Sequence, residues 1–231
     1  MFARLAGSQW SIASGYSKAL APGPLLSLGK GRCLAYTFAQ RVDCAGRIPF
    51  NQAMTSKQFF DWQTSGGTDD VMRLVDCLER ADVPWCCIGG VAVNHWAQQQ
   101  MVTRDVDLVI ALDAVERTVR LLEEAGFTSE RFPWSVNLKG RSAVSVQLST
   151  EDFYREFPSR SVPADVHGIL MRVASLQDTL AGKMKAWAEP ARRQSKQAKD
   201  FTDIVRLVEA RPALWESLTP AIRGLVKQPA E

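Results

Sequence analysis

The sequence has no long hydrophobic run and little cysteine, and each of these absences excludes a class of protein. No stretch approaches the roughly 18 consecutive apolar residues of a membrane-spanning helix, so no membrane partner is expected. The five cysteines are odd in number and form no C-x-x-C pair, which argues against a disulfide framework and a zinc site. They fit a reducing compartment and predict a cytoplasmic protein. Adjacent Cys86 and Cys87 are interpreted as small buried residues of a strand.

Acidic residues are nearly absent from residues 1–53. This segment holds six Lys or Arg and one acid, Asp43, for a net charge of +5, whereas the remainder holds 22 basic and 24 acidic residues. We interpret residues 1–53 as a disordered arm or as sequence ahead of a misannotated start, with Met54 opening the protein; an organellar transit peptide is the third alternative. The nearly neutral remainder shows no gross nucleic-acid footprint.

From residue 68 onward the sequence alternates helix and strand patterns. Thr68 is a predicted N-cap, followed by strands at residues 84–88 and 105–111 and helices at residues 91–98 and 113–126. Strand-like pieces near residues 135–138, 143–148 and 169–173 precede helices at residues 175–187, 197–209 and 212–226. This order predicts an α/β domain over residues 54–174 and a C-terminal helical region over residues 175–231.

Two acidic residues alternate with apolar ones between Asp105 and Ile110. Side chains of a strand alternate between its faces, so Asp105 and Asp107 point the same way, about 6.6 Å apart at roughly 3.3 Å per residue. Like charges this close repel each other, and a hard cation removes the conflict. Mg²⁺ (or Mn²⁺) binds carboxylate oxygens and keeps positions for phosphate oxygens, so both residues are predicted metal ligands.

A glycine pair, Gly89-Gly90, lies between a predicted strand and a predicted helix. Glycine lets the backbone approach a ligand closely, and the free N–H groups of the following helix favour phosphate. A Gly-Gly turn alone indicates little, and so does Asp-x-Asp alone, since a tight turn and a solvated strand edge explain them. Together, in this order with a helix between them, they predict a site for a nucleoside triphosphate.

This arrangement resembles the nucleotidyltransferase superfamily that includes DNA polymerase β. Ile88-Gly89-Gly90 followed by Asp105-Val106-Asp107 fits its signature, and the stretch from Thr103 to Leu108 is similar to AbiEii-like toxins of type IV toxin–antitoxin systems. The resemblance implies a mixed sheet flanked by helices, nucleotide contacts from Thr103 and Arg104, and an antitoxin as a possible protein partner. Such proteins usually carry an Arg two residues before the Thr, where this chain has Met101.

The C-terminal helices also resemble these relatives, through a Lys-containing helix and a Lys-Asp-x-x-Asp helix. Lys183 falls on the apolar stripe of its predicted helix, so it needs an anionic partner or a cleft. Two interpretations remain, a lysine that binds triphosphate and a lysine that extends its head to solvent at a helix end. Asp200 is the predicted partner for Lys183 or the substrate, and Asp203 is interpreted as a solvated or helix-pairing acid.

Active members of the superfamily usually place a third carboxylate on a later strand. The register of residues 143–148 puts Gln147 at that position, and an amide is no base at neutral pH. General-base help is worth about 10²–10⁴ in rate, so its loss slows transfer without abolishing nucleotide binding. Glu151 and Asp165 are the alternative acids, although their spacing favours neither. The seven tryptophans, Trp134 among them, are scattered and are interpreted as core residues.

Three functions remain in competition. The first is a metal-dependent nucleotidyltransferase that moves a nucleoside monophosphate from NTP to an RNA, protein or small-molecule acceptor, with Asp105, Asp107, Lys183 and Asp200 as its catalytic set. The second is a catalytically weakened module that binds nucleotide or a protein partner. The third is an RNA-binding accessory protein that uses the basic residues 1–53.

Overall fold

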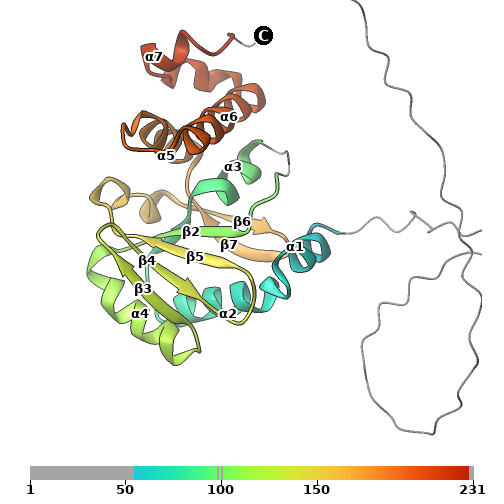
Figure 1. The fold of residues 1–231 in the computed structure, drawn as a ribbon, viewed down its shortest axis with the longest axis vertical. Helices are drawn as coiled ribbons and strands as arrows, with labels where there is room; N and C mark the ends of the chain where they lie inside the picture. The colour runs from blue at the N-terminus through green and yellow to red at the C-terminus, as the bar shows by residue number, and fades with distance from the viewer. Residues whose placement is uncertain (1–54, 98, 100, 229–231) are drawn as a thin grey trace, which may run out of the picture. The chain divides into compact units, whose positions relative to one another are not determined.

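A seven-stranded mixed sheet forms the centre of the computed structural model, which describes residues 55–97, 99 and 101–228 (Figure 1). The interpretations of residues 1–53 lie outside the described residues. The sheet has the order β3-β4-β5-β2-β1-β7-β6, with β2–β5 and β1–β7 parallel and the other pairs antiparallel. The strands are β1 (Trp85–Cys87), β2 (Asp105–Ile110), β3 (Thr128–Phe132), β4 (Ser135–Lys139), β5 (Ser145–Ser149), β6 (Val162–Val166) and β7 (Ile169–Val173).

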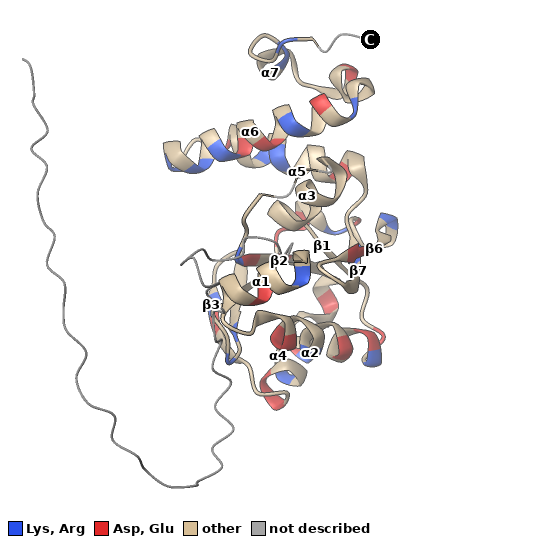
Figure 2. Ribbon diagram, turned by 90° about the vertical axis from the view of Figure 1, so that its right-hand side faces the viewer, with Lys and Arg blue, Asp and Glu red and all other residues tan. Residues whose placement is uncertain are grey.

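Helices cover both faces of the sheet. In Figures 1 and 2, α2 and α4 lie on one face, and α3, α5 and α6 lie beyond the other. The helices are α1 (Ser56–Thr64), α2 (Gly67–Arg80), α3 (Gly89–Ala97), α4 (Val115–Glu124), α5 (Leu176–Ala188), α6 (Gln194–Ala210) and α7 (Pro220–Arg223). This layered arrangement confirms the α/β fold class. None of the described helices is long and apolar enough to cross a membrane.

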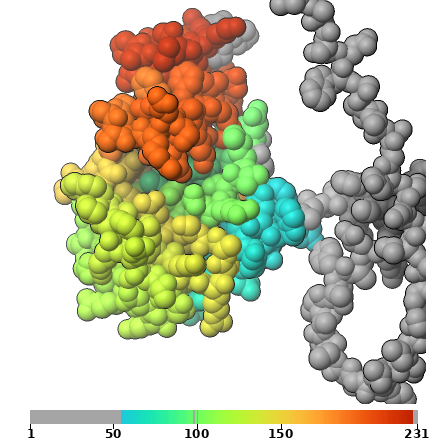
Figure 3. Space-filling view, in the orientation of Figure 1, coloured from blue at the N-terminus to red at the C-terminus, as the bar shows by residue number. Residues whose placement is uncertain are grey.

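The apolar core has two main parts, one on each side of the sheet. Val106, Leu108 and Ile110 of β2 are buried in the cluster that includes α2 and α4. A second cluster joins α3, α5 and α6 with the C-terminal residues, and the space-filling view shows the orange segment of α5 and α6 next to the green segment, with the red C-terminal residues beyond it (Figure 3). The alternating residues of β2 are therefore left facing the second group of helices.

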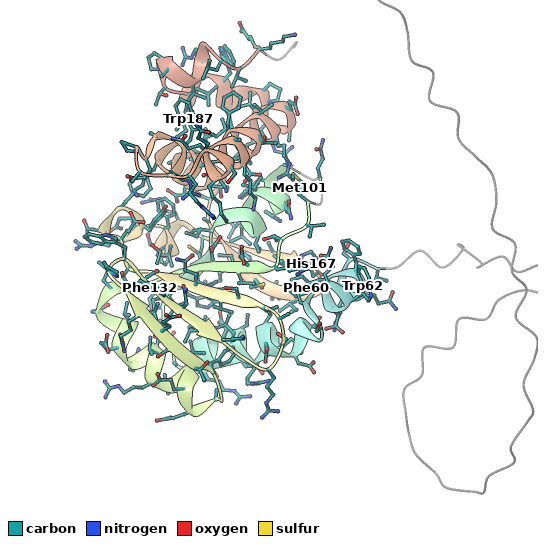
Figure 4. All side chains as sticks on the ribbon, in the orientation of Figure 1. Phe60, Trp62, Met101, Phe132, His167 and Trp187 are labelled. Carbon is teal, nitrogen blue, oxygen red and sulfur yellow. The ribbon has the colours of Figure 1, made fainter. Side chains whose placement is uncertain are left out.

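Helix α1 is held at the edge of the sheet by an aromatic contact. Phe60 stacks on His167 of the β6–β7 turn with ring centroids 4.7 Å apart, and Figure 4 shows the two labelled side by side. Burial lowers the pKa of His167, so its uncharged form faces Phe60. The sequence patterns did not indicate α1, β3 or β6.

Two expected boundaries differ in the structure. Helix α2 is capped by Gly66 rather than Thr68, whose amide donates to a carboxylate oxygen of Asp61 at 3.2 Å. The single helix expected at residues 212–226 is a 3₁₀ segment, Pro212–Ser217, followed by α7. Pro220 explains the break, because proline favours an extended conformation at the residue before it. Ser175 caps α5 as predicted.

Candidate nucleotide-binding site

The acidic strand β2 places its two carboxylates on the face opposite α2 and α4. Asp105 pairs in register with Ser145 of β5, and Asp107 pairs with Gln147. Val106 between them is buried, which fixes the strand's orientation. Asp105 is exposed at the start of the strand, and Asp107 is half-buried deeper in the site. The predicted arrangement of two acids on one face of one strand is therefore present.

The negative charge of Asp107 is disfavoured by its surroundings. Burial raises the pKa of its carboxyl, and the neighbouring charge of Asp105 raises it further. The lysines at positions 183, 196 and 199 act in the opposite direction without cancelling the rise. Figure 2 shows basic residues along α6, which carries the last two of these lysines. An anionic Asp107 therefore needs a further positive charge, and two adjacent carboxylates are a donor set that suits a hard divalent cation.

The glycine pair forms the corner against which Asp107 packs. Gly89 begins α3 with φ of +64°, a conformation that favours glycine. A Cβ at this position would lie 2.1 Å from an Asp107 carboxylate oxygen. A Cβ on Gly90 would meet the Thr103 hydroxyl at 3.1 Å. The Gly89 position is thus fixed both by backbone conformation and by the approach of Asp107.

We expect Gly89→Ala to impair the site far more than Gly90→Ala. The first change strains a positive φ, at a cost of about 1–3 kcal/mol, and drives a methyl group into the Asp107 carboxylate. The backbone of Gly90 is already helical, so an added methyl group there requires only a small shift of the Thr103 side chain. Nucleotidyl transfer by both variants, beside their thermal unfolding, tests this. Equal activity of the two variants would contradict a close Gly89–Asp107 contact.

Thr103 and Arg104, the other predicted nucleotide contacts, lie at the entrance to β2. The Thr103 hydroxyl donates to the Asp105 carbonyl at 3.2 Å and faces the Gly90 backbone. Arg104 is exposed, and its carbonyl accepts from the Ser145 amide. Thr103 therefore belongs to the glycine corner, whereas nothing brings the Arg104 side chain into the cavity beside Asp107.

Lys183 lies in a buried ion cluster between α5 and α6. Its ammonium is 3.0 Å from an Asp200 oxygen, as predicted, and 2.7 Å from an Asp203 oxygen. Of the two interpretations of Asp203, the solvated acid is wrong, because this residue is 1 % exposed, and the helix-pairing acid is confirmed by its ion pair with Arg206 on the same helix. Residues three apart are neighbours on a helix surface, so one lysine reaches both acids. Arg192, from the α5–α6 connection, binds the other oxygen of Asp200.

The same cluster is tied to the loop that enters β2. Arg206 of α6 contacts Asp203 at 2.9 Å and donates to the side-chain oxygen of Asn94 at 2.9 Å and to the Gln99 carbonyl. Asn94 of α3 in turn bonds both the amide and the carbonyl of Met101, at 3.1 and 2.7 Å. A continuous polar chain therefore runs from Lys183 to the segment that leads into Asp105.

A cavity of about 240 Å³ joins these parts. Asp107, Lys183, Asp200 and Gly89 all line it, so the structure brings together residues from four separate elements. Gln147 also lines it, in the position predicted for it. Its remaining lining residues are Ile88, Trp134, Ser135, Ser149, Glu151, Tyr154, Phe157, Asp178, Thr179, Gly182, Ala186 and Arg192.

The third-carboxylate position holds no acid. Over the described residues, no three His, Cys, Asp or Glu side chains gather closely enough to hold a metal ion together. Asp165 accepts from the Gly168 amide at 2.8 Å in the β6–β7 turn and does not line the cavity. Glu151 does line it, and it forms an ion pair with Lys185. A metal at Asp105 and Asp107 would take its other ligands from substrate phosphate and water.

Several cavity residues were missed by sequence reasoning. Arg192 lies in a connection without periodicity, and Tyr154 lies in a 3₁₀ turn, so neither has a local signal. Burial, with a smaller contribution from Glu151, raises the pKa of Tyr154, which keeps its phenol protonated. Trp134, interpreted as a core residue, is 69 % exposed, because it lies in the turn between β3 and β4. That correction brings an aromatic side chain into the cavity wall.

Comparisons with known proteins identify a family and a fold. Residues 88–231 match the family described as nucleotidyl transferase AbiEii toxin, type IV toxin–antitoxin system. The solution structure of the antibiotic-resistance factor ANT(2'')-Ia is 12% identical, with a TM-score of 0.50 over 70% of this chain and 91% of that one. A putative nucleotidyltransferase from Thermotoga maritima is 13% identical, with a TM-score of 0.40 over 51% and 83%. No curated protein matches the sequence. The fold shared with ANT(2'')-Ia confirms the expected nucleotidyltransferase-type sheet.

Proposed function

This chain belongs to the nucleotidyl transferase AbiEii toxin family, and we propose that it transfers a nucleoside monophosphate from a nucleoside triphosphate to a hydroxyl acceptor with the help of a divalent metal ion. One observation carries the proposal. A carboxylate whose pKa is raised by burial, Asp107, shares a cavity with the glycine corner at Gly89 and with the buried cation Lys183. That combination suits a metal-bound triphosphate.

Asp105 and Asp107 are the proposed metal ligands. Mg²⁺ or Mn²⁺ held there would neutralise the two carboxylates and polarise the α-phosphate of the nucleotide. The pKa of Asp107 makes this binding pH-dependent, because the metal competes with a proton that the carboxyl holds more tightly than usual. Metal affinity is therefore expected to fall as the pH drops.

The triphosphate is proposed to lie between the start of α3 and the ion cluster. Free N–H groups at the first turn of α3 favour phosphate oxygens, and the absence of a side chain on Gly89 permits a close approach. Lys183 and Arg192 both line the cavity and supply positive charge to the phosphates. Asp200 binds both cations and so acts as a positioning residue. Arg192 is thus a proposed phosphate contact in a chain that has Met101 where relatives carry an arginine.

The reaction itself is an in-line displacement. The acceptor hydroxyl oxygen forms a bond to the α-phosphorus, the bond to pyrophosphate breaks, and the hydroxyl proton passes to solvent water. Gln147 stands across from Asp107 but cannot take that proton. Transfer is therefore expected to be slow compared with an enzyme that carries a carboxylate at this position.

The isosteric change Gln147→Glu is expected to raise the transfer rate. The new carboxylate would share the face of Asp107 and act as a base, a contribution worth about 10²–10⁴ in favourable cases. We expect at least about a tenfold gain, together with a new dependence of rate on pH and tighter metal binding. Gln147→Met is the matched control. A slower Gln147→Glu enzyme would show that the amide itself serves the reaction.

The direct test is label transfer. The full chain is incubated with each α-labelled triphosphate, Mg²⁺ or Mn²⁺, and total RNA, protein extract or a small-molecule extract as acceptor. With metal, we expect the label on the acceptor and release of unlabelled pyrophosphate. With a chelator, we expect neither. Identical labelling in the two conditions would exclude the proposed metal dependence.

A second candidate function is a nucleotide-binding module with little or no catalysis. Gln147 at the base position favours it, and the retained Asp107–Lys183 cavity is compatible with it. Nucleotide binding without any label transfer would decide for this alternative. Because the family is described as a toxin of a type IV toxin–antitoxin system, we also propose that the active protein is a toxin restrained by an antitoxin. Co-expression with neighbouring genes tests whether one of their products relieves its toxicity.

A further inference from the structure

A second cavity, of about 620 Å³, adjoins the first. The two share Trp134, Glu151, Tyr154, Ala186 and Arg192 as a common wall. The second cavity extends beyond this wall along the last turns of α5, where Lys185 and Glu189 line it. The two cavities together therefore have room for more than a triphosphate, and the additional volume lies on the side of Trp134.

That side follows from the order of the strands. Gly89 follows β1, which lies on one side of the acidic strand β2, whereas β5 and β4 lie on the other. In an in-line displacement the attacking and departing oxygens lie on opposite sides of the α-phosphorus. With the departing phosphates at the Gly89 corner, the acceptor hydroxyl has to approach over β5 and β4. Trp134 directly precedes β4 and therefore lies on this side of β2.

The chemistry of the second cavity favours a flat ring over phosphate. Trp134 is 69 % exposed and Phe153 is 45 % exposed, and Phe153 lies edge-on to Tyr154 with centroids 4.9 Å apart. Aromatic faces of this kind stack on flat rings. Of the two cations that line this cavity, Lys185 pairs with Glu151, and Arg192, held by Asp200, is already assigned to the phosphates of the nucleotide.

We propose that this second cavity, defined by Trp134, Phe153 and Tyr154, is the acceptor subsite and that it takes a hydroxyl compound carrying a flat, phosphate-free ring. Trp134 is the stacking residue that separates the acceptor from the nucleotide. The inference rests on the proposed function, because it assigns the direction from which the acceptor reaches the same α-phosphate.

Three variants of Trp134 and two small probes test the assignment. Trp134→Ala removes the ring, Trp134→Phe keeps a smaller one, and Trp134→Leu keeps apolar bulk without a flat face. Because Trp134 is mostly exposed, all three are expected to fold, which thermal unfolding checks. Affinity is measured for a non-hydrolysable triphosphate analogue with Mg²⁺. Label transfer is measured with a limiting amount of the small-molecule extract as acceptor.

Trp134→Ala and Trp134→Leu are expected to bind the analogue within about twofold of the wild type and to lose about 5- to 150-fold in transfer, the worth of one stacked ring. Trp134→Phe should keep most of the transfer. Indole is expected to inhibit transfer without displacing the analogue, whereas inorganic triphosphate displaces it.

Each other outcome has a defined meaning. Weaker analogue binding by Trp134→Ala, or displacement of the analogue by indole, would assign the ring to the nucleotide base and overturn the proposal. Unchanged transfer by Trp134→Ala would overturn it as well. A wild-type protein that binds neither the analogue nor inorganic triphosphate would instead refute the proposed function, before any variant is compared.

Discussion

Asp107→Asn is expected to abolish nucleotidyl transfer and, at the same time, to stabilise the metal-free protein. The loss follows because a metal ion's charge stabilisation is worth several kcal/mol, and each 1.4 kcal/mol is about tenfold, so transfer should fall by at least about 10³-fold. The gain follows because the amide removes a carboxylate whose charge is opposed by burial and by Asp105.

The sign of the stability change can be followed with pH. The pKa of Asp107 is raised in the folded state, so between the ordinary carboxyl pKa and the raised value the folded protein holds a proton that the unfolded chain has lost. The metal-free wild type therefore gains stability as the pH falls through this window and loses it as the pH rises. Asp107→Asn lacks this component and should unfold at a higher temperature at neutral pH, by about 2–4 °C for each 1 kcal/mol.

Asp105→Asn provides the matched control. Asp105 is exposed, so its replacement is expected to reduce transfer without the same gain in melting temperature. Thermal unfolding in the presence of a chelator, from pH 4.5 to 8, together with label transfer, measures both effects. A less stable Asp107→Asn protein would mean that the carboxylate is held by interactions that outweigh its burial.

Lys183→Met is the second change with a large expected effect, and it is expected to cost both stability and nucleotide affinity. Removing one partner of a buried ion pair costs about 3–5 kcal/mol, and the lower end applies because Asp200 keeps Arg192 and Asp203 keeps Arg206. The melting temperature should then fall by about 6–12 °C. Loss of a charged contact with phosphate should weaken triphosphate binding by about 10- to 100-fold.

Lys185→Met is the control on the same helix. Lys185 is partly exposed and pairs with Glu151, so its loss should leave stability and the binding of inorganic triphosphate nearly unchanged. Lys183→Arg keeps the charge and separates the electrostatic contribution from the shape of the side chain. If Lys183→Met bound inorganic triphosphate like the wild type, Lys183 would be a structural cation only.

The acidic strand, the glycine corner and the position of Gln147 could be predicted from the sequence because each depends on local geometry. Alternation along one strand fixes which side Asp105 and Asp107 share, and the same rule in β5 puts Gln147 across from Asp107. The helical period placed Lys183 on an inward face in the same way. These rules require no knowledge of how elements pack together.

The rest of the site depends on packing between elements, which periodicity does not describe. Asp203 meets Lys183 only because α5 and α6 cross closely at that point. Arg192 enters the site from a connection, and Trp134 enters it from a turn at the rim of the sheet. A tryptophan in isolation reads as core, so its exposed position could be seen only after β3 and β4 were placed.

Arg206 makes helix α6 a structural support for the loop before β2, through Asn94 and the Gln99 carbonyl. A fragment ending at residue 174 would keep both proposed metal ligands, Asp105 and Asp107, but lose the anchor of the loop that precedes them. Separate expression of the α/β part is thus a poor route to an active enzyme. A ligand that displaces α6 would break the Arg206 contacts and release the loop before β2, even if it binds far from the cavity. Such a ligand would inhibit the protein without occupying the site.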